Sequence, residues 1–527
     1  MSGPDEWSAN ANKAVTISLI QQGAAAPLEI ANFCPKFTYP IFGQEEQIFG
    51  YQNLSIHLRF TAHDLLPNLE VTWDQKFKTI GDVKADDIEG TLRDWLSPSM
   101  SRFVLETRGL ANLIHQAAFG KTLSYLSDIQ DDGAGDLFKP PGEKITSYKI
   151  KDQRFEVWRG RLVDPAVRRI LGRIQIFIPF FIEGGSFLNL EEQEFSLERW
   201  SIFFLYEKLS HKPLPHSSTY SFIGYSTAYR YYFYDQDTPQ TLTLTTSKAY
   251  PKQAPFDFIL PIQTPPHHPS RERISQFLIL PPYQSQGHGS RFYGALVKDF
   301  LANPIIKEIT VEDPNEAFDD LRDFCDLKRL RENGTFEHIK INTNLSMPRH
   351  GKLPTSKIID KALLQQQRIH NKIAPRQFDR LVEMHLLSTV SAKNRKASSL
   401  AGGWGEYDFW RLLVKQRLYK FNRQSLAQLD LPERIDKLEE VFEGVESDYL
   451  RLLRGLERGE DEEPDTHEGR AADDKVANGN KGKKRAIEES EDEETENDDD
   501  DDNDDSDGYD DHMEGIERPA KRSKGWR

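Results

Sequence analysis

One stretch of the chain, Arg273–Ser290, constrains the fold most, because an apolar strand runs directly into a glycine loop. The loop has the pattern Gln-x-x-Gly-x-Gly, with Gln284, Gly287 and Gly289 at its fixed positions. Glycine has no Cβ, so the backbone there can bend sharply and turn several N–H groups toward one point. A helix beginning near Ser290 would present its positive end at the same point and favour an anion such as a pyrophosphate. A plain strand-to-helix turn is the alternative explanation of so short a motif.

The residues after the loop extend this prediction to a strand–loop–helix–strand unit. The loop lacks the Gly-Lys-[Ser/Thr] of a P-loop, which argues against a nucleoside triphosphate, and it lacks the third glycine of the dinucleotide fingerprint. An amphipathic helix is predicted over 291–302 and a second strand over 305–311. The apolar side of this helix consists of Phe292, Leu296, Val297 and Phe300. The second strand ends in Glu312-Asp313-Pro314-Asn315.

Charge is distributed unevenly along the 527 residues, whose formal net charge is −16. Residues 459–527 carry 27 acidic and 11 basic side chains, whereas residues 1–458 carry 57 of each. The last segment has almost no apolar residues, so we predict a disordered acidic tail. Two basic clusters interrupt this tail at 481–485 and 519–524. They are either nuclear import signals or merely charged residues exposed to solvent.

Composition excludes several classes of protein. No apolar run approaches the ~20 residues that a membrane helix needs, and the longest run, over 174–182, contains Pro179. The first residues lack the basic start and the apolar segment of a signal peptide. Cys34 and Cys325 are the only cysteines, which excludes a disulfide framework and a cysteine-rich zinc site. We therefore expect a soluble protein of the reducing cytosol or nucleus.

Hydrophobic periodicity and composition divide the chain into successive segments. The predicted segments are a flexible start (1–12), an amino-terminal α+β domain (13–165), a domain that holds the glycine loop (166–345, with a Thr- and Pro-rich insertion over 236–270), a helical carboxy-terminal domain (346–458) and the acidic tail (459–527). The predicted strands span 15–20, 54–62, 174–182, 200–206 and 229–234, and the predicted helices span 110–119, 358–370, 375–388, 409–421 and 431–456.

The strand, the Gln-x-x-Gly-x-Gly loop, the helix and the second strand together resemble the acetyl-coenzyme-A-binding core of the GNAT acetyltransferases. More narrowly, the chain is similar to the catalytic subunits of type B histone acetyltransferases, in a fungal-like form. The segments that carry the resemblance are Ile48–Tyr51, Phe181–Phe187, Glu198–Trp200, Tyr220–Tyr225, Phe277–Ser290 and Ile309–Asp323. They occur in the family's order over roughly residues 12 to 345. The resemblance implies a GNAT fold of the α+β / α/β class.

The resemblance also implies where acetyl-CoA, the co-substrate, would bind. The implied contacts are Phe277, Leu278, Ile279, Gln284, Ser285, Gln286, Gly287, His288, Gly289, Ser290 and Asn315. The strand residues would pair with the pantetheine amides and the loop would hold the pyrophosphate. A buried strand would use the same residue types as Phe277–Ile279, so that alternative stays open. Pro281 and Pro282 would end the regular pairing and help the two strands to splay.

Three carboxylates are candidates for the general base. A free lysine has a pKa near 10.4, so about one in a thousand is neutral and nucleophilic at pH 7. Glu312 stands at the carboxyl end of the second strand, where open sheets place ligands, and the family's catalytic glutamate matches it. Asp313 is adjacent, and Glu183 matches a second acid near the substrate lysine. Crowded carboxylates raise at least one pKa. Capping of a helix that begins near Asn315 is the alternative role for this acidic pair.

A histone tail is basic, so the neutral body of the chain must hold a local acidic or aromatic groove. The family's histone-tail contacts correspond to Glu45, Glu46, Trp200, Tyr229, Arg230 and Tyr231. Cross-strand packing of aromatic side chains is the alternative explanation for the tyrosines. The histidines, including His288, have no metal-ligand partners at useful spacing, so we expect no metal.

The sequence therefore predicts a histone acetyltransferase that transfers acetyl directly from acetyl-CoA to lysines of the histone 4 tail before chromatin assembly, with histone 2A as a lesser substrate. Implied partners are histone 3–histone 4 dimers and a WD-repeat β-propeller subunit, with no direct contact to nucleic acid or membrane. The expected location is the cytoplasm and nucleus. Two alternatives remain, which are a non-catalytic histone chaperone and an acetyltransferase of non-histone amines.

Overall fold

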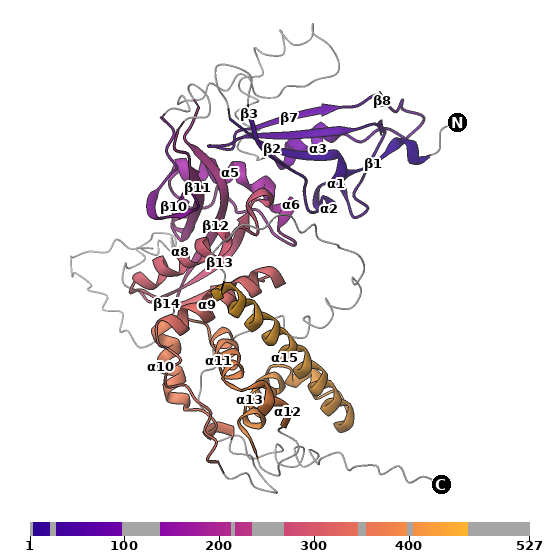
Figure 1. The fold of residues 1–527 in the computed structure, drawn as a ribbon. Coiled ribbons are helices and arrows are strands. Elements are labelled where there is room, and N and C mark those ends of the chain that lie inside the picture. Colours follow the sequence, from indigo (N-terminus) through magenta and orange to yellow (C-terminus); the bar gives the residue numbers. More distant parts are fainter. Residues whose placement is uncertain are drawn as a thin grey trace, which may run out of the picture. The chain divides into compact units, whose positions relative to one another are not determined.

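The computed structural model describes residues 4–21, 28–96, 137–211, 217–233, 268–345, 355–397 and 404–461. The chain divides into two compact units, residues 1–311 and 312–527 (Figure 1). The predicted helix over 110–119, nearly all of the loop insertion and the tail from residue 462 lie outside the described residues. No helix in the described ranges is long and apolar enough to cross a membrane.

Two main sheets organise the first unit. The four-stranded sheet has the order β3–β2–β6–β7, with β2 (Val15–Gln21), β3 (Leu28–Phe33), β6 (Ser55–Thr61) and β7 (Pro67–Thr72). The six-stranded sheet has the order β14–β13–β12–β11–β10–β9, with β9 (Glu143–Ile150), β10 (Gln153–Arg161), β11 (Trp200–Lys208), β12 (Tyr220–Tyr232), β13 (Ser270–Ile279) and β14 (Ile306–Val311). Its neighbours are antiparallel except β13 and β14, which are parallel.

Shorter elements complete the first unit. β1 (Ser8–Asn10) pairs with β4 (Gln47–Phe49), and β5 (Tyr51–Gln52) pairs with β8 (Gln75–Lys76). The helices are η1 (Pro4–Trp7), α1 (Ala11–Ala14), α2 (Tyr39–Phe42), α3 (Ile88–Trp95), α5 (Pro165–Ile174), η3 (Gln175–Phe177), α6 (Ile178–Phe181), α7 (Glu194–Leu197), η4 (Pro281–Tyr283) and α8 (His288–Ala302). The mixture of sheets and helices confirms the predicted α+β class.

The predicted strand–loop–helix–strand unit is confirmed. β13 leads through η4 and the glycine loop into α8, and β14 follows. The four side chains predicted on the apolar side of α8 are all buried, with Phe292 and Leu296 fully inaccessible to solvent. Because local glycine, proline and periodicity signals agree here, the local sequence determines the unit.

The predicted strand over 174–182 is wrong, because these residues are helical. The end of α5, then η3 and α6 occupy this run. Asp164 caps α5 by accepting the N–H of Ala166 at 2.8 Å, and Pro179 lies in the first turn of α6, where proline is tolerated. A short apolar run that is buried on all sides carries no periodicity to separate helix from strand.

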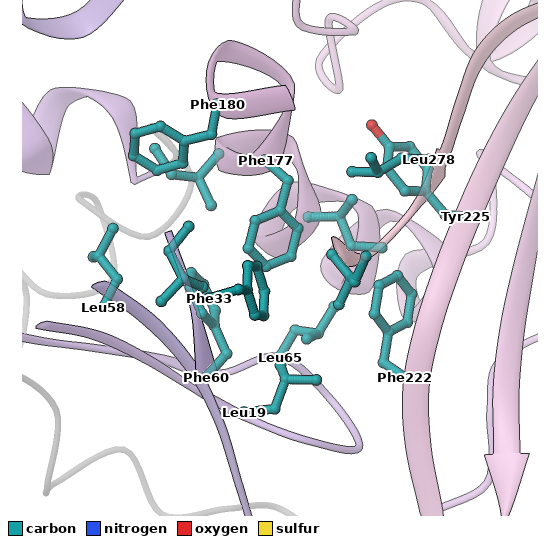
Figure 2. Close-up of a cluster of buried hydrophobic side chains, with 14 of the residues drawn as sticks. Leu19, Phe33, Leu58, Phe60, Leu65, Phe177, Phe180, Phe222, Tyr225 and Leu278 are labelled. Carbon is teal, nitrogen blue, oxygen red and sulfur yellow. The ribbon is translucent and has the colours of Figure 1, made fainter. Parts of the chain in front are cut away.

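The helical run lies in a core that joins the two sheets of the first unit, which Figure 2 shows in close-up. Phe60 of β6 packs against Phe177 of η3 with ring centroids 4.9 Å apart. Phe222 of β12 and Leu278 of β13 belong to the same buried cluster. Burying each large apolar side chain contributes about 1.5–3 kcal/mol. The core therefore holds in place the end of β13 that leads into the glycine loop.

The structure differs from the predicted domain boundaries in two places. β9 and β10, predicted to belong to a separate amino-terminal domain, pair into the six-stranded sheet through β11, so the boundary at 165/166 cuts across one sheet. The boundary predicted at 345/346 falls after Val311 instead, so the helix that follows β14 belongs to the second unit. Sequence patterns show where elements occur, whereas sheet pairing between distant strands decides which elements share a core.

The second unit is helical over the described residues. Its elements are α9 (Glu316–Glu332), η5 (Thr355–Lys357), α10 (Lys361–Asn371), α11 (Pro375–Thr389), α12 (Ala392–Ala397), α13 (Glu406–Phe421), α14 (Arg423–Leu426) and α15 (Leu431–Asp461). Its core includes the fully buried Trp410, whose indole N–H donates to the Glu383 carbonyl at 2.9 Å. The four predicted helices of this region correspond to α10, α11, α13 and α15.

Candidate active site

The two parallel strands separate partway along the sheet. β14 pairs with β13 from Ser270 to Ile274, and the last pair joins Ile274 to Val311. β13 continues beyond that pair to Ile279, while β12 stays paired with it along this length. The register between β12 and β13 also shifts between Thr227 and Ala228, at the same level. Such an irregularity bends a strand and helps to separate it from its neighbour.

The backbone beyond this point alternates between the two sides of β13. The Gln276 N–H donates to Thr227 Oγ1 at 3.1 Å, and the Leu280 N–H donates to the Ile223 carbonyl at 2.9 Å, so both residues face β12. Because successive residues of a strand turn their backbone groups to opposite sides, Phe277 and Ile279 face the side that β14 has left. Leu278, also predicted to contact the co-substrate, turns its backbone toward β12.

The glycine loop has the left-handed backbone that its sequence predicts. Gly287 has φ of 77° and is the N-cap of α8, with no side-chain cap. Ser285 also has a positive φ of 58°, which is unusual for a residue with a Cβ. His288, Gly289 and Ser290 form the first turn of α8, where backbone N–H groups have no acceptor within the helix. The end of this helix therefore suits an anion.

The two glutamines of the motif tie the loop to the end of the strand. The Gln284 side chain donates to the Ile279 carbonyl at 2.7 Å, on the side of β13 that β14 has left. The Gln286 side chain donates to the Pro282 carbonyl at 2.8 Å. Both glutamines therefore position the loop through their side chains.

His288 anchors the start of α8 to the opposite edge of the six-stranded sheet. Its side chain is buried, and Nδ1 lies 3.0 Å from the hydroxyl of Tyr148 on β9. The Phe155 ring packs edge-on against the imidazole at 4.4 Å. Burial, and then the charge of Arg291, lower the pKa of His288, while burial raises the pKa of Tyr148. Both directions favour a hydrogen bond between two neutral groups.

We expect Tyr148→Phe to weaken acetyl-CoA binding. The substitution keeps the ring that stacks on Phe155 at 5.3 Å but removes the hydroxyl that shares a hydrogen bond with His288. Losing the partner of a buried polar group costs about 1–3 kcal/mol, part of which would appear as a roughly 3- to 30-fold higher Kd. Calorimetry with acetyl-CoA measures it. Tyr231→Phe, which also removes one hydroxyl, is the control and should leave the Kd unchanged.

Two of the three candidate carboxylates begin the second unit. Glu312 is exposed and is joined directly to Val311, the last residue of the β13–β14 ladder. Asp313 is exposed and has φ of 35°. The predicted capping role falls to Asn315, whose side chain accepts the Phe318 N–H at 3.0 Å as the N-cap of α9.

The third carboxylate belongs to a loop held against β13. Glu183 is exposed and follows α6, next to Gly184, which has φ of 69°. Farther along this loop, the carbonyl of Ser186 accepts the side chain of Gln276 at 2.9 Å. Gln276 lies just beyond Ile274, so the loop of Glu183 contacts β13 at the level where β14 leaves it.

Three of the predicted substrate residues form an aromatic row on neighbouring strands. Trp200 of β11 packs against Tyr229 of β12 with ring centroids 4.8 Å apart, and Tyr229 packs against Tyr231 at the same distance. Tyr231 is 41% exposed, and the guanidinium of Arg273 lies 4.9 Å from its ring centroid. The three rings therefore pack across strands, as the alternative explanation predicted. Tyr231, at the end of the row, remains accessible to a ligand.

Arg230 and Glu46, two other predicted substrate contacts, are engaged within the protein. Arg230 pairs with Glu272, a fully buried carboxylate whose pKa is raised by burial. Glu46 accepts the N–H of Thr38 at 2.7 Å and the side chain of Asn12 at 2.5 Å. These contacts hold the start of α2 and the β1–β4 region together, which gives Glu46 a structural role. Glu45 beside it is exposed.

Several residues that shape the site carried no signal in the sequence. They are Tyr148, Gln276 and Tyr225, whose polar partners lie far away along the chain. The Tyr225 hydroxyl, for example, donates to the Gln276 side chain at 3.2 Å. Among the described residues, the structure brings together no group of His, Cys, Asp or Glu that could hold a metal ion.

Comparison with known proteins agrees with this geometry. The family model described as "Histone acetyl transferase HAT1 N-terminus" matches residues 7–183, and "Fungal HAT1, C-terminal" matches residues 323–391. A type B histone acetyltransferase catalytic subunit of Aspergillus oryzae is 40% identical over 476 residues, covering 86% of this chain and 87% of its own. The chain belongs to the family of type B histone acetyltransferase catalytic subunits.

Other members of the family match over a similar length. The catalytic subunits of Pyricularia oryzae and Neurospora crassa are each 37% identical, covering 93% of this chain and 100% and 96% of their own. The protein is accordingly an acetyl-CoA-dependent lysine N-acetyltransferase that acts on histones, and acetyl-CoA is its co-substrate. The residues present fit that co-substrate, because β13 offers backbone groups beyond its pairing with β14 and the first turn of α8 suits a pyrophosphate.

Proposed function

We propose that this type B histone acetyltransferase acetylates lysines in the amino-terminal tail of newly synthesised histone 4, and to a lesser extent histone 2A, before chromatin assembly. The observation that carries the proposal is the separation of β14 from β13 after the Ile274–Val311 pair. At this level the first unit has a strand with outward-facing backbone, an anion-suited helix start and the exposed carboxylate of Glu183, and Glu312 directly follows Val311 in the chain. Direct acetyl transfer to an amine needs these three elements.

The co-substrate contacts follow from the backbone. Phe277 and Ile279 would pair with the pantetheine amides, and one of their N–H groups would donate to the thioester carbonyl as negative charge develops on it. The first turn of α8, with Gly287 before it, would hold the pyrophosphate. Acetyl-CoA would supply an acetyl thioester, whose carbonyl carbon would bond to the lysine nitrogen while the C–S bond breaks. Coenzyme A would leave as a thiolate and take up the second proton that the nitrogen loses.

The proton of the substrate ammonium needs a base, and we assign that role to Glu312. A carboxylate oxygen of Glu312 would accept the proton and leave a neutral amine for attack. Glu183 and Asp313 would hold the cationic substrate near this base as carboxylates. The exposed position of Glu312 supports the assignment, because a bound lysine could reach the carboxylate.

Substrate and partners follow from the exposed aromatic row and from the family. Trp200, Tyr229 and Tyr231 would pack against a glycine-rich peptide, with Glu45 as an exposed acid for its basic side chains. A WD-repeat β-propeller histone-binding subunit would present histone 3–histone 4 dimers. We place the protein in the cytoplasm and nucleus, without direct contact to nucleic acid or membrane and without a metal.

One assay tests the proposed function. The recombinant full chain is incubated with acetyl-CoA and a histone 4 tail peptide, and acetylated lysines are located by mass spectrometry. A histone 2A tail peptide should be modified more slowly. Preferential labelling of other peptides on an array would instead favour an acetyltransferase of non-histone amines, and the absence of any labelling would favour a histone chaperone.

The acidic tail should matter for whole histones and not for short peptides. Deleting residues 459–527 removes a net charge of −16 from a body with equal numbers of acidic and basic side chains. We expect nearly unchanged turnover on a histone 4 peptide, salt-dependent loss of histone capture, because the Debye length is ~8 Å at physiological salt, and reduced nuclear accumulation. Loss of peptide acetylation in a truncated protein that still binds acetyl-CoA would contradict this prediction.

A further inference from the structure

A cleft in the second unit lies far along the chain from the residues assigned to acetyl transfer. It has a volume of about 600 Å³ and is lined by α10, α11 and α13. Apolar side chains such as Phe378 and Val382 line part of it. The charged side chains that line it are Lys361, Arg368, Arg376, Arg417, Lys420, Asp379 and Glu383. Neither the family assignment nor the proposed chemistry gives this cleft a role.

The lining of the cleft has an excess of positive charge. Five basic side chains face two acids, and one of these acids is already neutralised. Glu383 receives both Arg417 Nε at 2.9 Å and Arg417 Nη2 at 3.0 Å, and it also accepts the Tyr449 hydroxyl at 2.9 Å. The lining as a whole therefore carries five basic groups against two carboxylates, so the cleft attracts anions.

The accessible lysines of the lining belong to different helices. Lys361 begins α10 and Lys420 lies near the end of α13, and both are exposed. Arg376 of α11 lies over the ring of Phe421, 4.4 Å from its centroid, which holds the guanidinium beside an apolar surface. Such a surface fits an extended acidic peptide, which can place carboxylates against several cations at once.

We propose that this basic cleft binds the acidic tract of the chain's own tail, residues 488–511. Of these 24 residues, 17 are Asp or Glu and none is Lys or Arg. The tract is therefore the strongest complement to the cleft that the chain contains. A basic histone tail has the wrong sign of charge for the same lining.

The connection between cleft and tract has sufficient length. The last described residue of α15 is Asp461, and α15 belongs to the same unit as the cleft and packs against α11 and α13 (Figure 1). Residues 462–487 lie between Asp461 and the tract, and these 26 residues can span at most about 90 Å. Because tract and cleft belong to one chain, their binding would be intramolecular, so even modest intrinsic affinity would keep the cleft occupied.

Asp379 makes the interaction dependent on pH. It is accessible to solvent through the cleft, yet the surrounding protein and the charge of Glu383 raise its pKa to about 6. The groups around it are Glu383 on its own helix, Arg368 of α10 and Arg417 of α13. Protonation removes one of the two negative charges of the lining, so binding of the tract tightens as the pH falls through about 6.

Cross-linking of the full chain tests the occupant directly. A carbodiimide joins carboxylates to lysine amines at contact distance, and mass spectrometry locates the links. We expect links from 488–511 to Lys361 and Lys420 to exceed those to Lys340 and Lys393, two exposed lysines of the same unit outside the cleft. They should disappear at 1 M salt, where the Debye length is ~3 Å. Equal linking of all four lysines would overturn the proposal.

A peptide in trans measures affinity and specificity. A labelled 488–511 peptide is titrated into the full chain whose own tract carries Asn, Gln and Ser in place of its acids. Lys361→Glu with Lys420→Glu should weaken binding by on the order of tenfold or more, whereas Lys340→Glu with Lys393→Glu, which changes the net charge equally, should not. Equal weakening by both pairs would reduce the effect to net charge and contradict a specific cleft.

Two further comparisons complete the test. Asp379→Asn should bind the peptide more tightly at pH 7 and should lose the change in affinity between pH 5 and 7; an unaltered pH dependence contradicts the role of Asp379. Isotope-labelled and unlabelled full chains are also mixed before cross-linking. Links within one chain are expected, whereas links that join a labelled to an unlabelled chain would assign the cleft to the tail of a second copy.

Discussion

Glu312→Gln should lower turnover on a histone 4 tail peptide by on the order of 100-fold or more at pH 7. Glutamine keeps the size of the side chain and its hydrogen bonding, but it cannot accept a proton. Glu312 is exposed, so the variant should fold normally, and a thermal unfolding scan checks that. Acetyl-CoA affinity, measured by calorimetry, should persist because the glycine loop and the β13 backbone are unchanged.

The pH dependence of the variant separates loss of a base from loss of positioning. Without a base, the enzyme must take substrate lysine that is already neutral, and that fraction rises about tenfold per pH unit below a pKa near 10.4. The turnover of Glu312→Gln should therefore rise steeply between pH 7 and 9 and recover much of the loss. A variant that had only misplaced the substrate would keep a constant deficit over that range.

Two matched substitutions distinguish the neighbouring acids. Glu183→Gln and Asp313→Asn remove carboxylates in the same way, and each should raise KM for the peptide more than it lowers kcat. Near-normal turnover of Glu312→Gln at pH 7 would contradict the assignment of Glu312 as the general base. The base would then be Glu183, Asp313 or water. A large loss of turnover in Glu183→Gln alone would identify Glu183 as the base.

The sequence predicted the catalytic core well because several local signals agree over 273–315. The prolines end the strand, Gly287 supplies the left-handed turn, and the period of apolar residues marks α8. Each signal depends on neighbours within a few residues, and no distant contact has to be known. The start of α9 at Glu316 follows the same logic, because Asn315 is a strong N-cap.

The error over 174–182 shows the limit of such reasoning. Almost every side chain of this run is buried between the sheets of the first unit, so neither the helical nor the strand period is visible. Pro179 was compatible with either structure, and the cap at Asp164 lies ten residues before the run begins. The choice of helix depends on packing against β6 and β12, which only the folded unit provides.

The site residues divide along the same line. Gln284 positions the loop through a side-chain contact with a nearby carbonyl, Gly287 does so through its backbone conformation, and the motif revealed both. The roles of His288 and Glu46 depend on partners 140 and 34 residues away along the chain. The sequence therefore predicted that His288 contacts acetyl-CoA and that Glu46 contacts the histone tail. In the structure, both side chains make anchoring contacts within the protein.

Gly287→Val should raise the Kd of acetyl-CoA by on the order of 100-fold. Gly287 has φ of 77°, a conformation that costs a residue with a Cβ about 1–2 kcal/mol, and valine is branched at that atom. An added Cβ would also lie 2.3 Å from Nη1 of Arg291, so this side chain would have to leave the Gly287 carbonyl that it now contacts at 3.0 Å. The loop would relax away from the geometry that aims the first N–H groups of α8 at a phosphate. Calorimetry with acetyl-CoA measures the change.

The same helix provides the control for this substitution. Gly294 lies on the exposed side of α8, where an added Cβ meets nothing within 4 Å, so Gly294→Val introduces the same side chain without touching the loop. It should leave acetyl-CoA affinity within about twofold of the parent, because exposed substitutions away from special geometry change little. Both variants should show the same unfolding transition of the helical second unit. If Gly287→Val bound acetyl-CoA as tightly as Gly294→Val, the pyrophosphate could not lie at this loop, and the backbone of β13 alone would have to hold the co-substrate.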